Sequence, residues 1–227
     1  ELLSRRRISP ELNRAVKWYL SQLHGGSARG DRELEVVKQL PHYLQVALLS
    51  EMYWPVMSFH PLFSDLNVEV PTLTVHLTGE VLENVLAYPE EVVFSTWETC
   101  RRMLFVTSGI LKYAHNRLDS NDSLTLPHRE SSPSMGPNDQ PGEQVNKNSW
   151  VSEAVLWIHW EHQGSLTAQS YCDLLALEPG KFAEAVALHV KSFPRVTLYA
   201  RAFVATLAAQ SEFSDLTYQM SDYMLFV

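Results

Sequence analysis

The apolar positions along this chain of 227 residues change their spacing near residue 67. Up to that point they recur every three or four residues, which is typical of helices that bury one face. Ser9 is suited to cap the first helix, and Pro55 is expected to end the third. Residues 1–66 are therefore predicted to be helical, with apolar faces that cover either their own chain's sheet or a neighbouring subunit.

Shorter apolar runs follow in the second region, with one more segment of helical spacing from Glu80 to Ala87. Val92-Val93-Phe94 and Met103 to Val106 are β-branched and aromatic runs, which favour strands. Gly109 is placed for a turn between two strands. Two helices are expected near the end, at Phe182 to Val190 and Val196 to Leu207. The pattern as a whole predicts an α+β fold.

The segment from 117 to 149 breaks this pattern, because it is rich in Ser, Asn, Asp, Pro and Gly. Such a composition buries little apolar surface, and its prolines exclude a regular helix or ladder. We therefore expect a mobile insertion between two parts of the second region.

Composition narrows the class of partner and the compartment. The net charge of −8 and pI near 5.6 argue against nucleic acid, since Arg5 to Arg7 form the one basic cluster in the sequence. Cys100 and Cys172 provide no disulfide framework and fit a reducing compartment. No apolar run approaches the roughly 20 residues that span a bilayer, and the start lacks a signal-peptide pattern. We expect a cytoplasmic chain that is a fragment of a longer protein.

Residues 151–177, VSEAVLWIHWEHQGSLTAQSYCDLLAL, combine a turn and helix that carry one carboxylate with two strand-like runs. This layout resembles the phosphate-binding cassette of cyclic-nucleotide-binding domains. In that family an F-G-E segment opens the cassette and an R-[TAS]-A segment closes it. The carboxylate meets the ribose 2′-hydroxyl, while the arginine and backbone N–H groups meet the cyclic phosphate. The resemblance implies an antiparallel, jelly-roll-like β-roll with flanking helices, one of which moves as a lid over the base.

Aligned on Tyr171-Cys172-Asp173-Leu174, the family's positions fall on Val151-Ser152-Glu153 and His162-Gln163-Gly164. The resemblance then implies these candidate ligand residues for cAMP or cGMP: Ser152, Glu153, Ala154, His162 and Gln163. The carboxylate matches, but His162 stands in place of the arginine and Ser152 in place of the glycine. Loss of the arginine's charge-assisted contact would cost about 1.5–3 kcal/mol, so we expect a degenerate pocket.

Several alternatives stay open around this pocket. Glu153 also suits a helix start, where a carboxylate accepts from backbone N–H groups, and His162 also suits an ordinary surface or core position. Trp157 and Trp160 add bulk that fills ligand space. The tail from Glu212 to Val227 is a candidate plug of the pocket, or else a core strand or frayed end.

The first region carries a second resemblance, in RRRISPELNRAVKWYL and LPHYLQVALLSEMYWPVMSFHPLFSDL. Both stretches resemble the C-linker of cyclic-nucleotide-gated, hyperpolarisation-activated and ether-à-go-go-type channels. The resemblance implies that residues 1–66 join four identical subunits in a gating ring below the channel's transmembrane domain. Arg5 to Arg7 would then lie at the cytoplasmic side of the membrane, where basic residues meet anionic lipid or are solvated.

The sequence therefore predicts a C-linker at 1–66, a cyclic-nucleotide-binding-like β-roll at 67–210 and a tail at 211–227. We expect the regulatory and assembly region of a tetrameric, potassium-type cation channel with a degenerate pocket. One alternative is a true cAMP or cGMP sensor of such a channel. Another is a regulatory subunit of a cyclic-nucleotide-dependent kinase. No catalytic motif is present, and His159, His162 and Cys172 do not converge as zinc ligands, so we expect neither an enzyme nor a bound cofactor.

Overall fold

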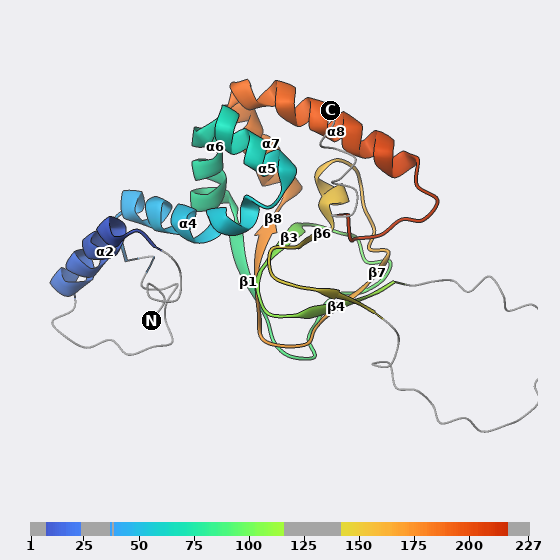
Figure 1. Cartoon of the computed structure of the whole chain (residues 1–227), viewed down its shortest axis with the longest axis horizontal. Helices are drawn as coiled ribbons and strands as arrows, with labels where there is room; N and C mark the ends of the chain where they lie inside the picture. Colours follow the sequence, from blue (N-terminus) through green and yellow to red (C-terminus); the bar gives the residue numbers. More distant parts are fainter. Residues whose placement is uncertain (1–7, 24–36, 38, 116–141, 218–227) are drawn as a thin grey trace, which may run out of the picture.

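The computed structural model of the chain describes residues 8–23, 37, 39–115 and 142–217, with helices on one side of a β-roll (Figure 1). The helices that precede the β-roll are α2 (Pro10–Leu23), α4 (His42–Met57), α5 (Pro61–Glu69), α6 (Pro71–His76) and the π-helical η1 (Leu77–Val81). Those within and after it are the 3-10 turns η2 (Glu153–Leu156) and η3 (Val190–Ser192), with α7 (Pro179–Leu188) and α8 (Phe193–Ala208).

Two antiparallel sheets of four strands form the β-roll. The first has the order β1-β8-β3-β6, with β1 (Glu83–Ala87), β8 (Cys172–Leu177), β3 (Met103–Ser108) and β6 (Trp150–Val151). The second has the order β2-β7-β4-β5, with β2 (Val92–Phe94), β7 (Gly164–Ala168), β4 (Leu111–His115) and β5 (Glu143–Val145). This order is that of a jelly roll, so the predicted α+β class with an antiparallel β-roll is confirmed.

Alternate residues of the strands point between the two sheets and form one core. Val106, Leu111, Leu166 and Leu174 are fully buried there, and Leu216 joins them from the segment after α8. At one end of this core Gly109 has φ of +93°, and a Cβ on it would lie 2.5 Å from Cys172 Sγ. The turn between β3 and β4 therefore requires glycine, as predicted.

A second core lies between the first sheet and the helices. Phe63 of α5 packs on Phe105 of β3 at 5.6 Å between ring centroids, and on Phe182 of α7 at 5.9 Å. Leu48, Met57 and other apolar residues of α4 belong to the same cluster. α4 and α5 thus bury apolar side chains against their own chain's first sheet, and the predicted domain boundary at residue 66 stays a prediction.

Three expectations about local structure were wrong. Glu80 to Ala87 is not one helix, because η1 ends at Val81 and β1 pairs with β8 over five residue pairs, which overrides a short periodic pattern. Pro55 does not end a helix, since α4 continues to Met57 and burial of Val56 and Met57 offsets one lost hydrogen bond. The predicted insertion is shorter than 117–149, because β5 pairs with β4 and Val145 is buried.

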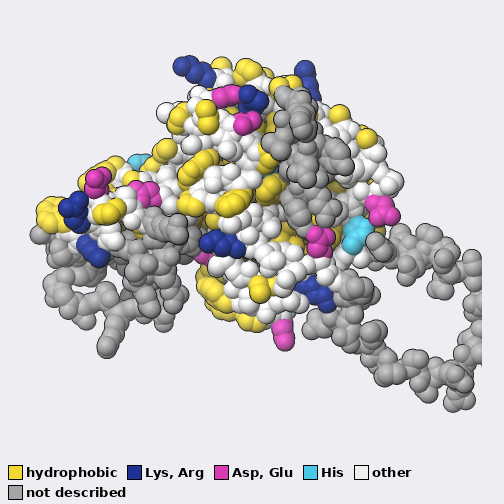
Figure 2. Space-filling view, viewed as in Figure 1, with side chains coloured by type: hydrophobic (Ala, Val, Ile, Leu, Met, Phe, Trp, Pro, Cys, Tyr) yellow, Lys and Arg dark blue, Asp and Glu magenta, His cyan; other side chains and the backbone are white. Residues whose placement is uncertain are grey.

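Some predicted segments lie outside the described residues. These are the basic cluster Arg5 to Arg7, the insertion from 117 to 141 and the tail from 218 to 227. Within the part that the structure describes, none of the helices is long and apolar enough to span a bilayer. On the face drawn in Figure 2, Lys and Arg side chains lie scattered among acidic ones.

Candidate functional site

The cassette begins where β6 ends and the chain turns into η2. Ser152 takes φ of 62° and ψ of 32° at this turn, a left-handed conformation that favours glycine. It is the position at which the resembling family has its glycine. The strained serine is held by its surroundings, because its backbone N–H donates to the carbonyl of Asp215 at 2.7 Å.

Asp215 comes from the segment that follows α8. After α8 ends, the chain turns back toward the β-roll (Figure 1), and residues 215–217 become buried. The Asp215 side chain is fully buried, and Leu216 beside it packs into the core between the sheets. The tail therefore enters the cassette as part of the folded domain.

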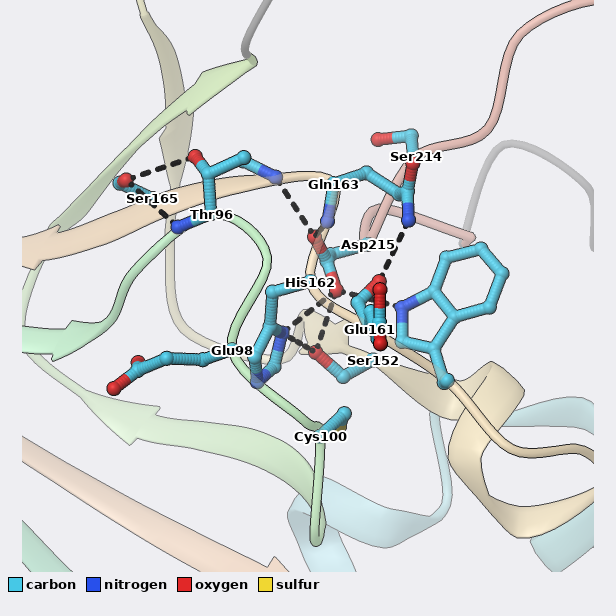
Figure 3. A network of polar contacts seen from close by, with 12 residues as sticks. Thr96, Glu98, Cys100, Ser152, Glu161, His162, Gln163, Ser165, Ser214 and Asp215 are labelled. Atoms are coloured by element: carbon cyan, nitrogen blue, oxygen red, sulfur yellow. Dashed lines mark hydrogen bonds and ion pairs between the residues drawn. The ribbon is translucent and has the colours of Figure 1, made fainter.

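Six donors surround the Asp215 carboxylate, several of which Figure 3 shows converging on it. Oδ1 accepts from His162 Nδ1 at 2.8 Å, Trp160 Nε1 at 2.9 Å and Ser152 Oγ at 3.2 Å. Oδ2 accepts from the Gln163 N–H at 2.7 Å, the Tyr113 hydroxyl at 3.0 Å and the Gly164 N–H at 3.3 Å. A buried carboxylate needs such donors, so this is a built anion site with its anion in place.

His162 supplies the positive charge of this site. Burial alone lowers its pKa, but the hydrogen bond to Asp215 and the neighbouring Cys100 outweigh burial and raise the pKa from 6.5 to about 9. Burial raises the pKa of Asp215, yet its bonds with His162 and Trp160 lower it overall. Phe94 stacks on the imidazole at 3.6 Å and fixes the ring plane. The pair is therefore charged at neutral pH.

Glu153 faces a different part of the molecule, although it follows Ser152 directly. Its carboxylate accepts from Trp150 Nε1 at 3.0 Å, Tyr199 OH at 2.8 Å and Thr217 Oγ1 at 3.3 Å, and it lies 3.2 Å from His60 Nε2. Burial raises its pKa, but the charge and hydrogen bonds of these neighbours lower it overall.

Of the residues proposed from sequence, Ser152, His162 and Gln163 lie together around one anion. Gln163 takes part through its backbone N–H, while its side chain donates to the Glu161 carbonyl. Ala154 is fully buried, and neither it nor Glu153 is among the donors to Asp215 that the described residues provide. Whether any of the five contacts a nucleotide stays a prediction.

The sequence analysis missed two residues of the anion site, Asp215 and Tyr113. The signal for Asp215 was indirect: a histidine in a phosphate-binding position calls for an anion, and the proposed plug contains Glu212 and Asp215. The two bulky tryptophans lie in different surroundings. Trp160 donates to Asp215, whereas Trp157 packs against Phe182 of α7.

The next question is whether the described side chains could bind a metal ion. In the described ranges, no group of three or more His, Cys, Asp or Glu side chains is placed to hold a metal ion. What this arrangement can do chemically is bind a compact anion through a cation, two backbone N–H groups and neutral donors.

Comparison with known proteins gives similarities of shape. No family model matches the sequence, and no curated relative was found. One similar solved structure is a cyclic nucleotide-binding-like protein from Brucella abortus, with TM-score 0.45, 10% identity and coverage of 59% of this chain and 96% of that one. Another is the N-terminal domain of a transcriptional regulator from Streptomyces coelicolor, with TM-score 0.49, 20% identity and coverage of 70% and 96%. Neither is described as a channel, and our assignment of the fold rests on the strand order.

Proposed function

We propose that this chain is the regulatory and assembly region of a tetrameric cation channel, with a cyclic-nucleotide-type pocket that its own C-terminal segment occupies. One observation carries the proposal: Asp215 takes the donors that the resemblance assigns to a cyclic phosphate. The anion at these donors is therefore a carboxylate of the chain itself.

Self-occupation explains the histidine in the arginine position. An arginine offers a planar fork to a phosphate, whereas one imidazole donor is sufficient for a carboxylate that has five further donors. A tethered carboxylate also competes at an effective concentration in the millimolar range or above. A free nucleotide would have to displace the tail and then bind without the arginine.

The helices before the β-roll support the assembly part of the proposal. In Figure 1, α2 and the start of α4 extend away from the β-roll. Tyr43 on α4 is 70% exposed, and Phe59 between α4 and α5 is 57% exposed. Exposed large apolar side chains suit contact with another subunit, and the resemblance to the C-linker gives that subunit as a second copy of the chain.

Calorimetric titration with cAMP and cGMP to millimolar concentration tests the pocket. We expect no saturable heat with the unmodified chain, and saturable binding with the Asp215→Ala, His162→Arg double variant, whose pocket regains a phosphate fork. Glu212→Ala with His162→Arg is the matched control, because Glu212 is an exposed acid of the same segment. Micromolar binding by the unmodified chain would contradict self-occupation and favour a nucleotide sensor.

Sedimentation analysis tests the assembly. A concentration-dependent tetramer that Tyr43→Ser and Phe59→Ser weaken is expected, because these exposed side chains lie on α4 and in the turn between α4 and α5, in the region assigned to the subunit contact. A monomer at all concentrations up to the millimolar range would contradict this part and leave the account of the pocket intact.

A further inference from the structure

Glu153 has no role in the occupied anion site, yet both of its oxygens are engaged. Tyr199 donates to Oε1, while Oε2 accepts from Trp150 and Thr217 and lies beside His60. The side chain is 1% exposed. A carboxylate has about four acceptor directions, and here three donors and the facing His60 ring surround it. A ribose hydroxyl would have to replace one of them.

The four partners belong to four different parts of the fold. His60 lies between α4 and α5, Trp150 on β6, Tyr199 on α8 and Thr217 on the segment after α8. One carboxylate therefore connects the helices before the β-roll, the cassette, the last helix and the tail. In the described part of the chain, Asp215 has its side-chain partners on the β-roll and in the cassette alone.

The surroundings of Glu153 make these contacts interdependent. His60 is fully buried, with its ring 4.6 Å from Trp150, 4.9 Å from Phe63 and 5.8 Å from Tyr199. In such an apolar shell each hydrogen bond to a charge is strong, and exposure of that charge to water weakens all of them. A change at one partner is thus felt at the others.

The tail takes part in both networks. Asp215 fills the anion site, Leu216 is buried between the sheets, and Thr217 donates to Glu153. Departure of the tail from the anion site would remove the Thr217 hydroxyl from Glu153 Oε2. The loss of this donor changes the hydrogen bonding of the carboxylate that also meets His60 and Tyr199.

We propose that Glu153 is a positioning residue that couples occupation of the anion site by the tail to the packing of α8 and of the α4–α5 junction. It acts through Tyr199 and His60 rather than by contact with a nucleotide. The proposal rests on the tail being the regulated occupant. By linkage, if occupation by the tail changes the affinity of α4 and α5 for a partner by some factor, that partner changes the affinity of the anion site for the tail by the same factor.

Hydrogen exchange of the full chain tests the coupling through three regions: the tail at 211–217, the start of α8 at 193–203 and the α4–α5 junction at 54–66. Asp215→Ala should raise exchange at least about tenfold in the tail and by a smaller factor in both helical regions, as local opening becomes easier. Glu212→Ala is the matched control and should change none of them.

Thr217→Val isolates the coupling step, because it removes the hydroxyl and leaves Asp215 in place. Exchange at the α4–α5 junction and the start of α8 should rise about threefold or more, while His162 keeps its bond to Asp215. Thr206→Val is the matched control, since the Thr206 hydroxyl donates to Ala202 within α8. Should Asp215→Ala fail to fold, Thr217→Val carries the test.

Two outcomes are distinguishable. If the tail exchanges faster in Asp215→Ala while both helical regions stay unchanged there and in Thr217→Val, the coupling by Glu153 is wrong and self-occupation stands. If the tail of the unmodified chain already exchanges as fast as in Asp215→Ala, the proposed self-occupation is itself wrong.

Discussion

Asp215 and Glu153 are two buried carboxylates beside the same cassette, and they differ in what they hold together. Asp215 arrives on the C-terminal segment and meets donors of the β-roll. Glu153 belongs to the cassette and meets side chains of α8, the tail and the α4–α5 junction. One carboxylate can leave with its segment and be hydrated, while the other cannot leave without unfolding the core. The first suits an exchangeable occupant and the second a fixed connection.

The largest effect is expected from Glu153→Ala. It removes the acceptor for the Tyr199 hydroxyl and the Trp150 indole N–H, and the carboxylate that lies 3.2 Å from buried His60, which costs about 3–5 kcal/mol of unfolding free energy. Urea unfolding measures it. Glu178→Ala is the control, because this exposed residue is 3.8 Å from Lys181 and should change stability by less than about 0.5 kcal/mol. Equal losses of unfolding free energy in the two variants would contradict the larger structural role assigned to Glu153.

Asp215→Ala should destabilise the chain less, by about 1–3 kcal/mol, because the released segment exposes His162 and its neighbouring donors to water. Urea unfolding again measures the change, with Glu212→Ala as the neutral control. A loss as large as that of Glu153→Ala would mean that Asp215 is as much a part of the core as Glu153.

Two tyrosine variants compare the two carboxylates by removing one hydroxyl donor from each of them. In the described residues Tyr199 is the one donor to Glu153 Oε1, whereas Tyr113 shares Asp215 Oδ2 with the N–H groups of Gln163 and Gly164. Tyr199→Phe should therefore cost about 1.5–3 kcal/mol and Tyr113→Phe about 1 kcal/mol. The reverse order in urea unfolding would show that the Asp215 site depends on its neutral donors more than its geometry indicates.

The pH dependence is the mildest probe. The raised pKa of His162, about 9 against 6.5, means that its stabilisation is fully present below pH 6.5 and is lost as pH rises through 9. The lowered pKa of Asp215 means that its stabilisation is present above pH 3.8 and is lost as pH falls through the folded value. Unfolding measured across pH should show a smaller alkaline loss in Asp215→Asn than in the unmodified chain. An equal loss of stability at alkaline pH in both proteins would contradict an ion pair between His162 and Asp215.

Sequence patterns predict the parts of this fold that local chemistry controls. The runs at Val92 and Met103 form strands, and Gly109 makes its turn. Ser152 and His162, which the cassette alignment singles out, both contact Asp215. The failures come from contacts between distant residues. Pairing with β8 made a strand of residues 83–87, and Asp215 meets His162 across 53 positions of sequence. No periodicity records such a contact. The sequence therefore pointed to a cyclic phosphate at His162, while the Asp215 carboxylate that the structure places there was not singled out.

The most direct test of self-occupation is an NMR titration of the His162 ring nitrogens in the unmodified chain and in Asp215→Asn. The account predicts an imidazole protonated on both nitrogens at pH 7.5, with a pKa of about 9 that falls in the variant because its anionic partner is gone. A pKa near 6.5 that does not respond to Asp215→Asn would show that the tail does not occupy the site.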